Sequence, residues 1–171
     1  MAIKNAWRID PSQSKISFKV GYMQLGVITG EFHFFNGFVD CDEVFDEVDV
    51  TITVDSHSVT TFHPQRDEGI RMTDFFDAEQ YPIILLASTG FRKVSSGGLF
   101  ELTGLLTIRN RTLPIQAMVS LVSLALSEAV FKFSGTLSRK AFGLGGPGTP
   151  DQESVADEVE FFGEMCIRRE Q

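Results

Sequence analysis

Three histidines and two cysteines are the side chains of this 171-residue sequence with the most obvious chemistry. His33, His57 and His63 could bind a metal or act as general bases, but they lack the H-x-x-x-H and C-x-x-C spacings typical of zinc sites. Cys41 and Cys166 are expected to be free thiols. We therefore predict no metal site and no catalytic residue. An enzyme that uses His57 or His63 as its base stays open as an alternative.

Two segments match binding motifs only in part. Residues 143–148 have the spacing G-x-G-x-x-G of a dinucleotide-binding loop, but Pro147 and Pro150 remove backbone donors and no βαβ pattern surrounds the match. The acidic run of residues 40–49 lacks the glycine and the closing glutamate of a calcium loop. We interpret the first segment as a Gly/Pro loop and the second as a solvated hairpin connection.

The elements that must position these residues are mostly strands, because apolar and polar residues alternate with period 2 along much of the chain. Val48, Val50, Ile52 and Val54, for example, alternate with polar residues. Turn signals separate roughly eight such runs, which predicts one all-β domain over residues 1–171. Phe35 breaks the alternation of Phe32 and Phe34, which indicates a bulge or strand end near residues 36–37.

Residues 64–82 do not alternate, and we predict a short helical insertion there. Asp67 and Glu68 suit the start of a helix, and Asp74 could cap a second turn that carries Phe75 and Phe76. Many antiparallel strands with one such insertion are typical of a closed barrel or of a sandwich. Composition alone leaves these two architectures open.

Charge and composition exclude several classes of function. The net charge of −8 and the pI of about 4.8 argue against nucleic acid and against anchoring on anionic lipids. The longest uncharged run, residues 112–127, is shorter than the ~20 residues of a membrane helix. No secretory signal is evident at the N-terminus, so we expect a cytoplasmic protein unless a leader was removed.

Phenylalanine is unusually frequent, with 16 residues against 1 Trp and 2 Tyr. Burial of one Phe side chain is worth ~2–3 kcal/mol, so 16 of them could exceed what a core of this size needs. Some of them could line a cavity, since an eight-stranded barrel is just wide enough for a slender ligand. The alternative that all of them are ordinary core residues stays open.

The order of several motifs resembles the YceI-like family over nearly the whole chain. The central block is the most specific, with Arg66-Asp67, Asp74-Phe75-Phe76-Asp77 and Tyr81-Pro82 in the family's order and spacing. The flanking matches are Trp7-Arg8-Ile9-Asp10, Ser14 to Val20, Val27 to Phe32, Ser58 to Thr61, Ile70-Arg71, Ser88-Thr89, Leu106 to Ile115, Ser138 to Leu144 and Val155 to Glu160.

The resemblance implies an elongated lipocalin-like antiparallel β-barrel that binds, stores or transports a polyisoprenoid lipid, such as an isoprenoid quinone or a prenyl phosphate. It implies no required cofactor and no catalysis, and it admits a homodimer, since relatives often pair. The sequence departs from the family at Gln13 and Tyr22, where relatives commonly carry histidines. Many relatives also carry an export signal.

We expect the inward strand faces and the insertion to form the wall of the pocket. The predicted wall residues are Phe18, Val20, Phe32, Phe34, Ile52, Val54, Met72, Phe75, Phe76, Leu86, Leu106, Ile108, Phe131 and Phe133. Tyr22, Arg66 and Asp67 are predicted for a polar mouth. A structural ion pair between Arg66 and Asp67 that fixes the insertion is the favoured alternative for those two residues. A barrel filled with side chains, acting only as an interaction module, is the third functional hypothesis.

Overall fold

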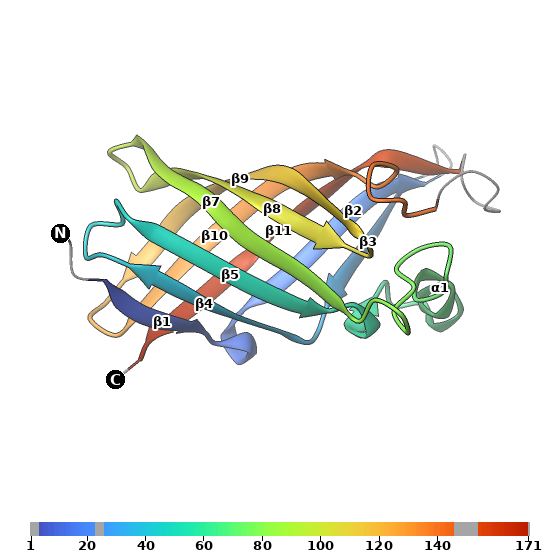
Figure 1. The fold of residues 1–171 in the computed structure, drawn as a ribbon, viewed down its shortest axis with the longest axis horizontal. Helices are drawn as coiled ribbons and strands as arrows, with labels where there is room; N and C mark the ends of the chain where they lie inside the picture. The colour runs from blue at the N-terminus through green and yellow to red at the C-terminus, as the bar shows by residue number, and fades with distance from the viewer. Residues whose placement is uncertain (1–3, 23–25, 146–153, 171) are drawn as a thin grey trace.

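The computed structural model describes residues 4–22, 26–145 and 154–170 (Figure 1). Part of the Gly/Pro segment predicted over residues 143–150 lies outside the described residues. The strands are β1 (Asn5–Ile9), β2 (Lys15–Tyr22), β3 (Gly26–Phe32), β4 (Phe35–Cys41), β5 (Val48–Asp55), β6 (Val59–Thr60), β7 (Ile83–Ser95), β8 (Leu99–Ile108), β9 (Arg111–Leu124), β10 (Glu128–Ser138) and β11 (Val155–Arg169). The helices are α1 (Pro64–Ile70) and the 3-10 turns η1 (Pro11–Gln13) and η2 (Ser56–Ser58).

Six of the strands are short and combine in pairs. Each pair, β1 with β2, β3 with β4 and β5 with β6, forms one long interrupted strand of the sheet. β1 and β2 are separated only by η1, and both pair with β11; β4 pairs with β1 as β3 pairs with β2. β5 and β6 likewise continue each other along β4 and β3. Within the described residues, the sheet is therefore an antiparallel meander of eight long strands, and the pairing of β1 with β11 closes it. The barrel prediction is confirmed, and the sandwich is excluded.

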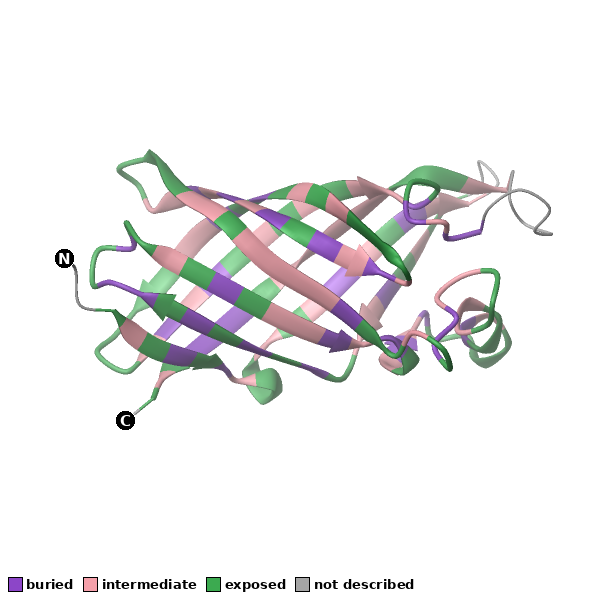
Figure 2. Cartoon of the chain, viewed as in Figure 1, coloured by how far each residue is buried: buried purple, intermediate pink, exposed green. Residues whose placement is uncertain are grey.

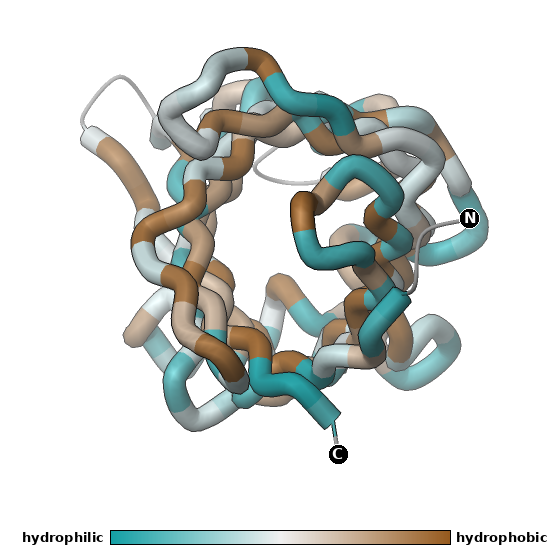
Figure 3. Tube along the Cα trace, turned by 90° about the vertical axis from the view of Figure 1, so that its left-hand side faces the viewer, coloured by the Kyte–Doolittle hydropathy of each residue, from teal (hydrophilic) through white to brown (hydrophobic). Residues whose placement is uncertain are grey.

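The view along the long axis shows the chain running as a ring around the axis (Figure 3). Buried and exposed residues alternate along the strands, as the bands in Figure 2 show. In β4 the alternation is complete, with Phe35, Gly37, Val39 and Cys41 buried and the residues between them exposed. Period 2 thus places one apolar face inside the barrel, as the sequence pattern predicts.

The predicted inward position of Phe34 is wrong. The regular pairing stops at His33 and Phe34, and not near residues 36–37 where the bulge or strand end is predicted, so β4 begins in a new phase at Phe35. The backbone N–H of Asp55 donates to the Phe34 carbonyl at 2.9 Å, while the Phe34 side chain is 69% exposed. Two inward residues, Phe32 and Phe35, lie on either side of the break, so the phase shift turns Phe34 outward.

The insertion between β6 and β7 contains one helix. His63 caps α1, since its Nδ1 accepts the backbone N–H of Arg66 at 3.1 Å. The second helical turn predicted around Asp74 is absent from these described residues; the chain turns there instead, and the N–H of Asp77 donates to the Met72 carbonyl at 2.8 Å. No helix in the described part of the chain is long and apolar enough to cross a membrane.

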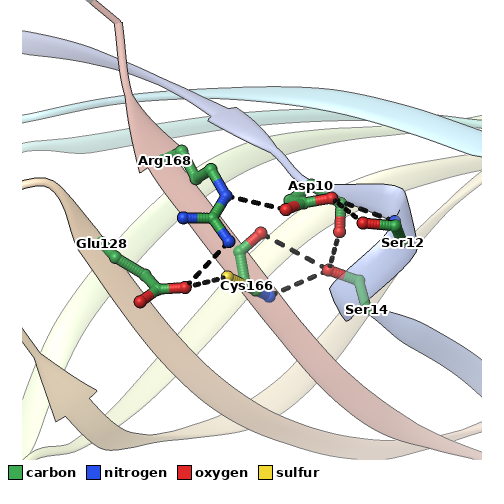
Figure 4. Close-up of polar contacts among 6 residues, drawn as sticks. All are labelled: Asp10, Ser12, Ser14, Glu128, Cys166 and Arg168. Atoms are coloured by element: carbon green, nitrogen blue, oxygen red, sulfur yellow. Dashed lines mark hydrogen bonds and ion pairs between the residues drawn. The ribbon is translucent and has the colours of Figure 1, made fainter.

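A polar cluster holds the seam between the first and last strands (Figure 4). Arg168 of β11 forms ion pairs with Asp10 at 2.7 Å and with Glu128 of β10 at 3.2 Å. Ser14 donates to the Asp10 carbonyl and accepts the backbone N–H of Cys166 at 2.9 Å. The cluster thus ties the chain around η1 to β10 and β11, at the place where the long strand β1–β2 is interrupted.

Candidate functional site

The barrel encloses a cavity of about 820 Å³. Apart from Phe34, all the predicted wall residues line it, so the strand alternation located the inner face correctly. Many of these side chains, including Ile52, Leu86 and Phe133, are only half-buried although they lie inside the barrel. Inward apolar side chains keep such exposure when they face an unfilled space, and this argues against the filled-barrel hypothesis.

One end of the cavity is closed by aromatic packing. Phe45 lies in the acidic β4–β5 connection with φ of 58°, and its buried ring packs edge-on against Phe100 at 6.1 Å and Phe131 at 5.6 Å between centroids. Phe91 stacks on Phe100 at 4.8 Å. Phe45, Phe91 and Phe131 line the cavity and form its floor, and Phe100 packs behind them. Phe45 gives no signal in the sequence, because it stands in a charged turn, outside any strand pattern.

The other end of the cavity is its mouth, because the lining there includes exposed residues of the insertion, among them Gln65, Met72 and Thr73. Phe76 from the insertion reaches down to the wall, where its ring packs edge-on against Phe32 at 5.7 Å. The Phe18 ring lies 5.7 Å from that of Phe32. The insertion therefore supplies both the rim and part of the apolar wall.

Glycines opposite phenylalanines keep the wall flat. On β10 and β11, Gly135 pairs with Phe161 and Phe133 pairs with Gly163 in direct register. A Cβ atom added to Gly135 would overlap the Phe161 ring, and one added to Gly163 would lie 2.8 Å from the Phe133 ring. Each ring thus occupies the place of the missing side chain and lies along the wall. Gly30 and Phe18 repeat this arrangement on β3 and β2.

Most of the described polar residues that line the cavity lie at the mouth, and Ser17 of β2 also belongs to the lining. Tyr22 and Arg66 line the cavity, as predicted, together with Thr61, His63 and Gln65. Arg66 Nε donates to Thr61 Oγ1 at 2.8 Å, and Arg66 Nη2 donates to the Thr61 carbonyl at 3.1 Å. The guanidinium is therefore held in place at the edge of the cavity by the chain that precedes α1.

Asp67 lies behind the mouth and does not line the cavity, which corrects its predicted place there. Its buried carboxylate accepts the backbone N–H and the hydroxyl of Thr61, and the hydroxyl of Thr60 at 2.9 Å. Burial opposes the charged form, but these hydrogen bonds and the charge of Arg71 outweigh it and hold the pKa of Asp67 below its usual range. Within the described residues, Arg66 and Asp67 meet through Thr61 and form no direct ion pair.

Arg139 is a lining residue that the sequence analysis did not select. It is 3% exposed, and its guanidinium donates to the carbonyls of Leu144, Gly145, Val155 and Ala156 at 2.7–2.9 Å. Arg139 thereby ties the segment after β10 to the start of β11 at the mouth. Arg139 lies in the segment Ser138 to Leu144, which carries part of the family resemblance. That resemblance is the sequence feature that could have indicated a role for it.

The histidines do not form a metal centre. Among the described residues, no group of three or more His, Cys, Asp or Glu side chains is placed to bind a metal ion. His57 lies outside the cavity lining, between Asp55 at 3.4 Å and Glu79 at 3.7 Å. His33 contacts Glu31 at 2.8 Å on the outside of the barrel. His63 lines the cavity, but its Nδ1 is engaged in the helix cap.

The chain is similar in sequence to known proteins. The family described as YceI-like domain matches residues 7–164. A UPF0312 protein of Pectobacterium atrosepticum is 28% identical over 149 residues, which cover 82% of this chain and 77% of the relative. Protein YceI of Salmonella newport is 26% identical over 167 residues, which cover 93% of this chain and 84% of the relative.

Solved structures share the fold. The crystal structure of Burkholderia cenocepacia BcnA superposes with a TM-score of 0.84 at 24% identity and covers 92% of this chain and 98% of its own. A polyisoprenoid binding domain from Saccharophagus degradans superposes with a TM-score of 0.79 at 13% identity, covering 97% of this chain and 99% of its own. At such identities the likeness supports the barrel fold alone.

Proposed function

The chain belongs to the YceI-like domain family, and from this premise we propose that it binds a polyisoprenoid lipid inside the barrel and performs no chemistry on it. The observation that carries the proposal is the apolar cavity of about 820 Å³, closed at the aromatic floor and open at the insertion. A structural neighbour described as a polyisoprenoid binding domain supports the choice of ligand class.

The affinity would come from the tail. Transfer of apolar groups from water into such a cavity is favourable by ~0.8 kcal/mol per CH₂ before the cost of ordering the chain is subtracted. A branched, unsaturated isoprenoid chain fits a wall of flat rings and branched aliphatic side chains, which offers apolar contact without fixed hydrogen bonds. In this arrangement the tail lies toward the floor of Phe45, Phe91 and Phe131.

The headgroup would lie at the mouth, where most of the polar lining residues are. Arg66 offers charged donors, since its hydrogen bonds to Thr61 use only Nε and Nη2, and Tyr22 adds a hydroxyl. These groups could donate hydrogen bonds to the carbonyl of an isoprenoid quinone or to the oxygens of a prenyl phosphate. A barrel that encloses the tail in this way could store or transport either lipid.

Lipid extraction tests the proposal. Protein purified from cells is extracted with organic solvent, and the extract is analysed by mass spectrometry for isoprenoids. The delipidated protein is then mixed separately with an isoprenoid quinone, a prenyl phosphate and a straight-chain fatty acid, and adducts are counted by native mass spectrometry. We expect a one-to-one adduct with an isoprenoid. No isoprenoid in the extract and no adduct in the mixtures would contradict the proposal.

The alternative of an enzyme with a histidine base has less support. His57 lies away from the cavity, and His63 uses Nδ1 to cap α1. If His63 were a base, His63→Ala would abolish turnover of a bound lipid. Under our proposal, neither the wild type nor His63→Ala converts the lipid. The molecular mass of the lipid recovered after incubation with either protein therefore equals that of the lipid supplied.

A further inference from the structure

Phe62 is an exposed aromatic residue in an unfavourable backbone conformation beside the mouth. Its φ is 61°, and its side chain is 68% exposed. A bulky residue rarely adopts a positive φ, and an exposed Phe gains little from the hydrophobic effect in the folded protein. The turn is nevertheless well held, because the Phe62 N–H donates to Thr60 Oγ1 at 3.0 Å. Strained residues cluster at functional sites, so the conformation of Phe62 motivates a hypothesis about its function.

The neighbours of Phe62 show where it points. Thr61 and His63, on either side in the chain, both line the cavity, whereas Phe62 does not. Its ring therefore projects outward from the edge of the mouth. Met72, on the same insertion, lines the cavity and is 60% exposed, so it belongs both to the wall and to the outer surface. We call Phe62 and Met72 the apolar rim.

The charges near the apolar rim are mainly acidic. The insertion, residues 61–82, carries two arginines against five acidic residues, Asp67, Glu68, Asp74, Asp77 and Glu79, so its net charge is −3. Arg71 donates to the carbonyls of His57 and Val59. The whole chain carries −8. An anionic membrane surface attracts clusters of basic residues, which this region lacks. A zwitterionic lipid surface carries no net charge to repel this acidic region, and exposed apolar side chains can insert among its headgroups.

From these observations we propose that the mouth docks on the surface of a zwitterionic lipid bilayer, with the apolar rim inserted among the headgroups. This inference rests on the proposed function, because an isoprenoid tail dissolves poorly in water and must come from a lipid phase. The rim is continuous with the cavity wall through Met72. A tail could thus pass from the bilayer into the barrel along apolar contacts. Attachment through so few side chains is weak and reversible, as repeated loading requires.

Vesicle flotation with the full chain tests the docking. The wild type, Phe62→Asp, Phe62→Asn and Leu126→Asp are mixed with phosphatidylcholine vesicles, and the floating fraction is measured. Leu126 is the matched control, since it is 85% exposed in the β9–β10 connection at the end opposite the insertion. We expect the vesicle affinity of both Phe62 variants to fall about tenfold or more, and that of Leu126→Asp to stay within twofold.

Folding and ligand binding are measured on the same proteins. Asn and Asp tolerate a positive φ, so both Phe62 variants should unfold at or above the wild-type temperature, which separates lost attachment from lost structure. An isoprenoid quinone supplied from ethanol should bind these variants like the wild type, because Phe62 is not on the cavity wall.

The outcomes separate the two proposals. Normal binding of quinone from ethanol with no flotation of the wild type would overturn the docking and leave the proposed function in place. Equal flotation of wild type and Phe62→Asp, an equal loss in Leu126→Asp, or flotation only with anionic vesicles would also overturn it. Failure of every isoprenoid to bind from ethanol would instead contradict the proposed function.

Discussion

Asp67 shows how a residue that looks chemical can be structural. Its carboxylate collects the backbone N–H and hydroxyl of Thr61 and the hydroxyl of Thr60, and Thr61 in turn holds Arg66. The sequence indicated that Arg66 and Asp67 act together, but the partner that joins them stands five and six residues earlier. Local spacing gives no sign of such an indirect link. The anchoring role favoured for the pair fits Asp67, while Arg66 also reaches the mouth.

Replacing Asp67 tests this anchor through its pH dependence. Because the folded pKa of Asp67 is lowered by its hydrogen bonds, the ionised carboxylate stabilises the fold above its unfolded pKa of about 3.9. That stabilisation is lost as the pH falls through the lower folded pKa. We expect Asp67→Asn to lower the free energy of unfolding by about 1–3 kcal/mol at pH 7 and by less at pH 3.

Urea unfolding at the two pH values measures this difference. Exposed Glu68, the next residue, provides the control Glu68→Gln, for which we expect little change at either pH. A loss in Asp67→Asn that is the same at pH 7 and pH 3 would mean that the charge of the carboxylate is not what stabilises the insertion.

The two cysteines are free, as expected, and both are buried. Burial raises the pKa of the Cys41 thiol to about 11. Burial and the Glu128 carboxylate, which accepts the thiol proton at 3.1 Å, raise the pKa of Cys166 to about 11. Both thiols are therefore protonated at neutral pH and shielded from reagents.

Thiol labelling checks this state. At pH 8 we expect an aromatic disulfide reagent to leave both cysteines of the native protein unmodified over minutes, and to modify both at once when the chain is unfolded in guanidinium chloride. Leu126→Cys supplies an exposed thiol that should react immediately in the native protein. Rapid reaction of one native cysteine would indicate that its part of the barrel opens readily.

At the scale of strands, period 2 was enough to find the inner face but not its interruptions. The alternation in β4 and β8 matches burial residue by residue, because each strand has one face inside and one outside. The predicted inward position of Phe34 was wrong because the sequence shows that the phase of the alternation changes but not at which residue it changes. The place of the break depends on hydrogen bonds with Ser58 and Asp55, which belong to a distant strand and turn.

The facing glycines and phenylalanines predict a specific cost for a small substitution. Gly135→Ala would place a Cβ against the Phe161 ring and 2.6 Å from the Gln116 carbonyl oxygen. We expect a loss of about 1–3 kcal/mol in the free energy of unfolding, together with weaker isoprenoid binding, because the ring must move into the cavity. Gly97→Ala is the control, since the nearest atom to its added Cβ would be 3.7 Å away.

A double-mutant cycle shows whether the ring is the cause. If Phe161 is the obstacle, Gly135→Ala combined with Phe161→Ala should cost less in unfolding free energy than the sum of the single changes, by more than about 0.5 kcal/mol. Additive costs would assign the effect to the Gln116 carbonyl alone.

At the scale of the whole molecule, closure of the sheet was not readable from the strands themselves. A barrel and a sandwich share the same alternating pattern, and only the family resemblance distinguished them. Closure depends on β1 pairing with β11, the first and last strands of the chain. The floor likewise depends on Phe45, which a connection between strands brings against Phe100 and Phe131. Contacts of this range leave no periodic signal in the sequence.

A larger inward side chain should lower the unfolding temperature of a barrel with a filled core but not that of a barrel with an empty cavity. This difference gives a test of the whole barrel. Ala117 of β9 is 7% exposed and lines the cavity, so Ala117→Trp would place an indole in the empty space. Because that space holds no packed side chains, we expect the unfolding temperature to stay equal or rise, while isoprenoid binding falls at least about tenfold.

Met118, the next residue, is 37% exposed and is absent from the cavity lining, so Met118→Trp adds the same group to the outer surface and should preserve binding. The two variants are compared by thermal unfolding and by native mass spectrometry with an isoprenoid quinone. Strong destabilisation by Ala117→Trp would mean that the interior is already full, since overpacking of a dense core costs stability. Undiminished binding in a stable Ala117→Trp would place the ligand outside the barrel. Loss of binding without loss of stability is the result that only a ligand-holding cavity predicts.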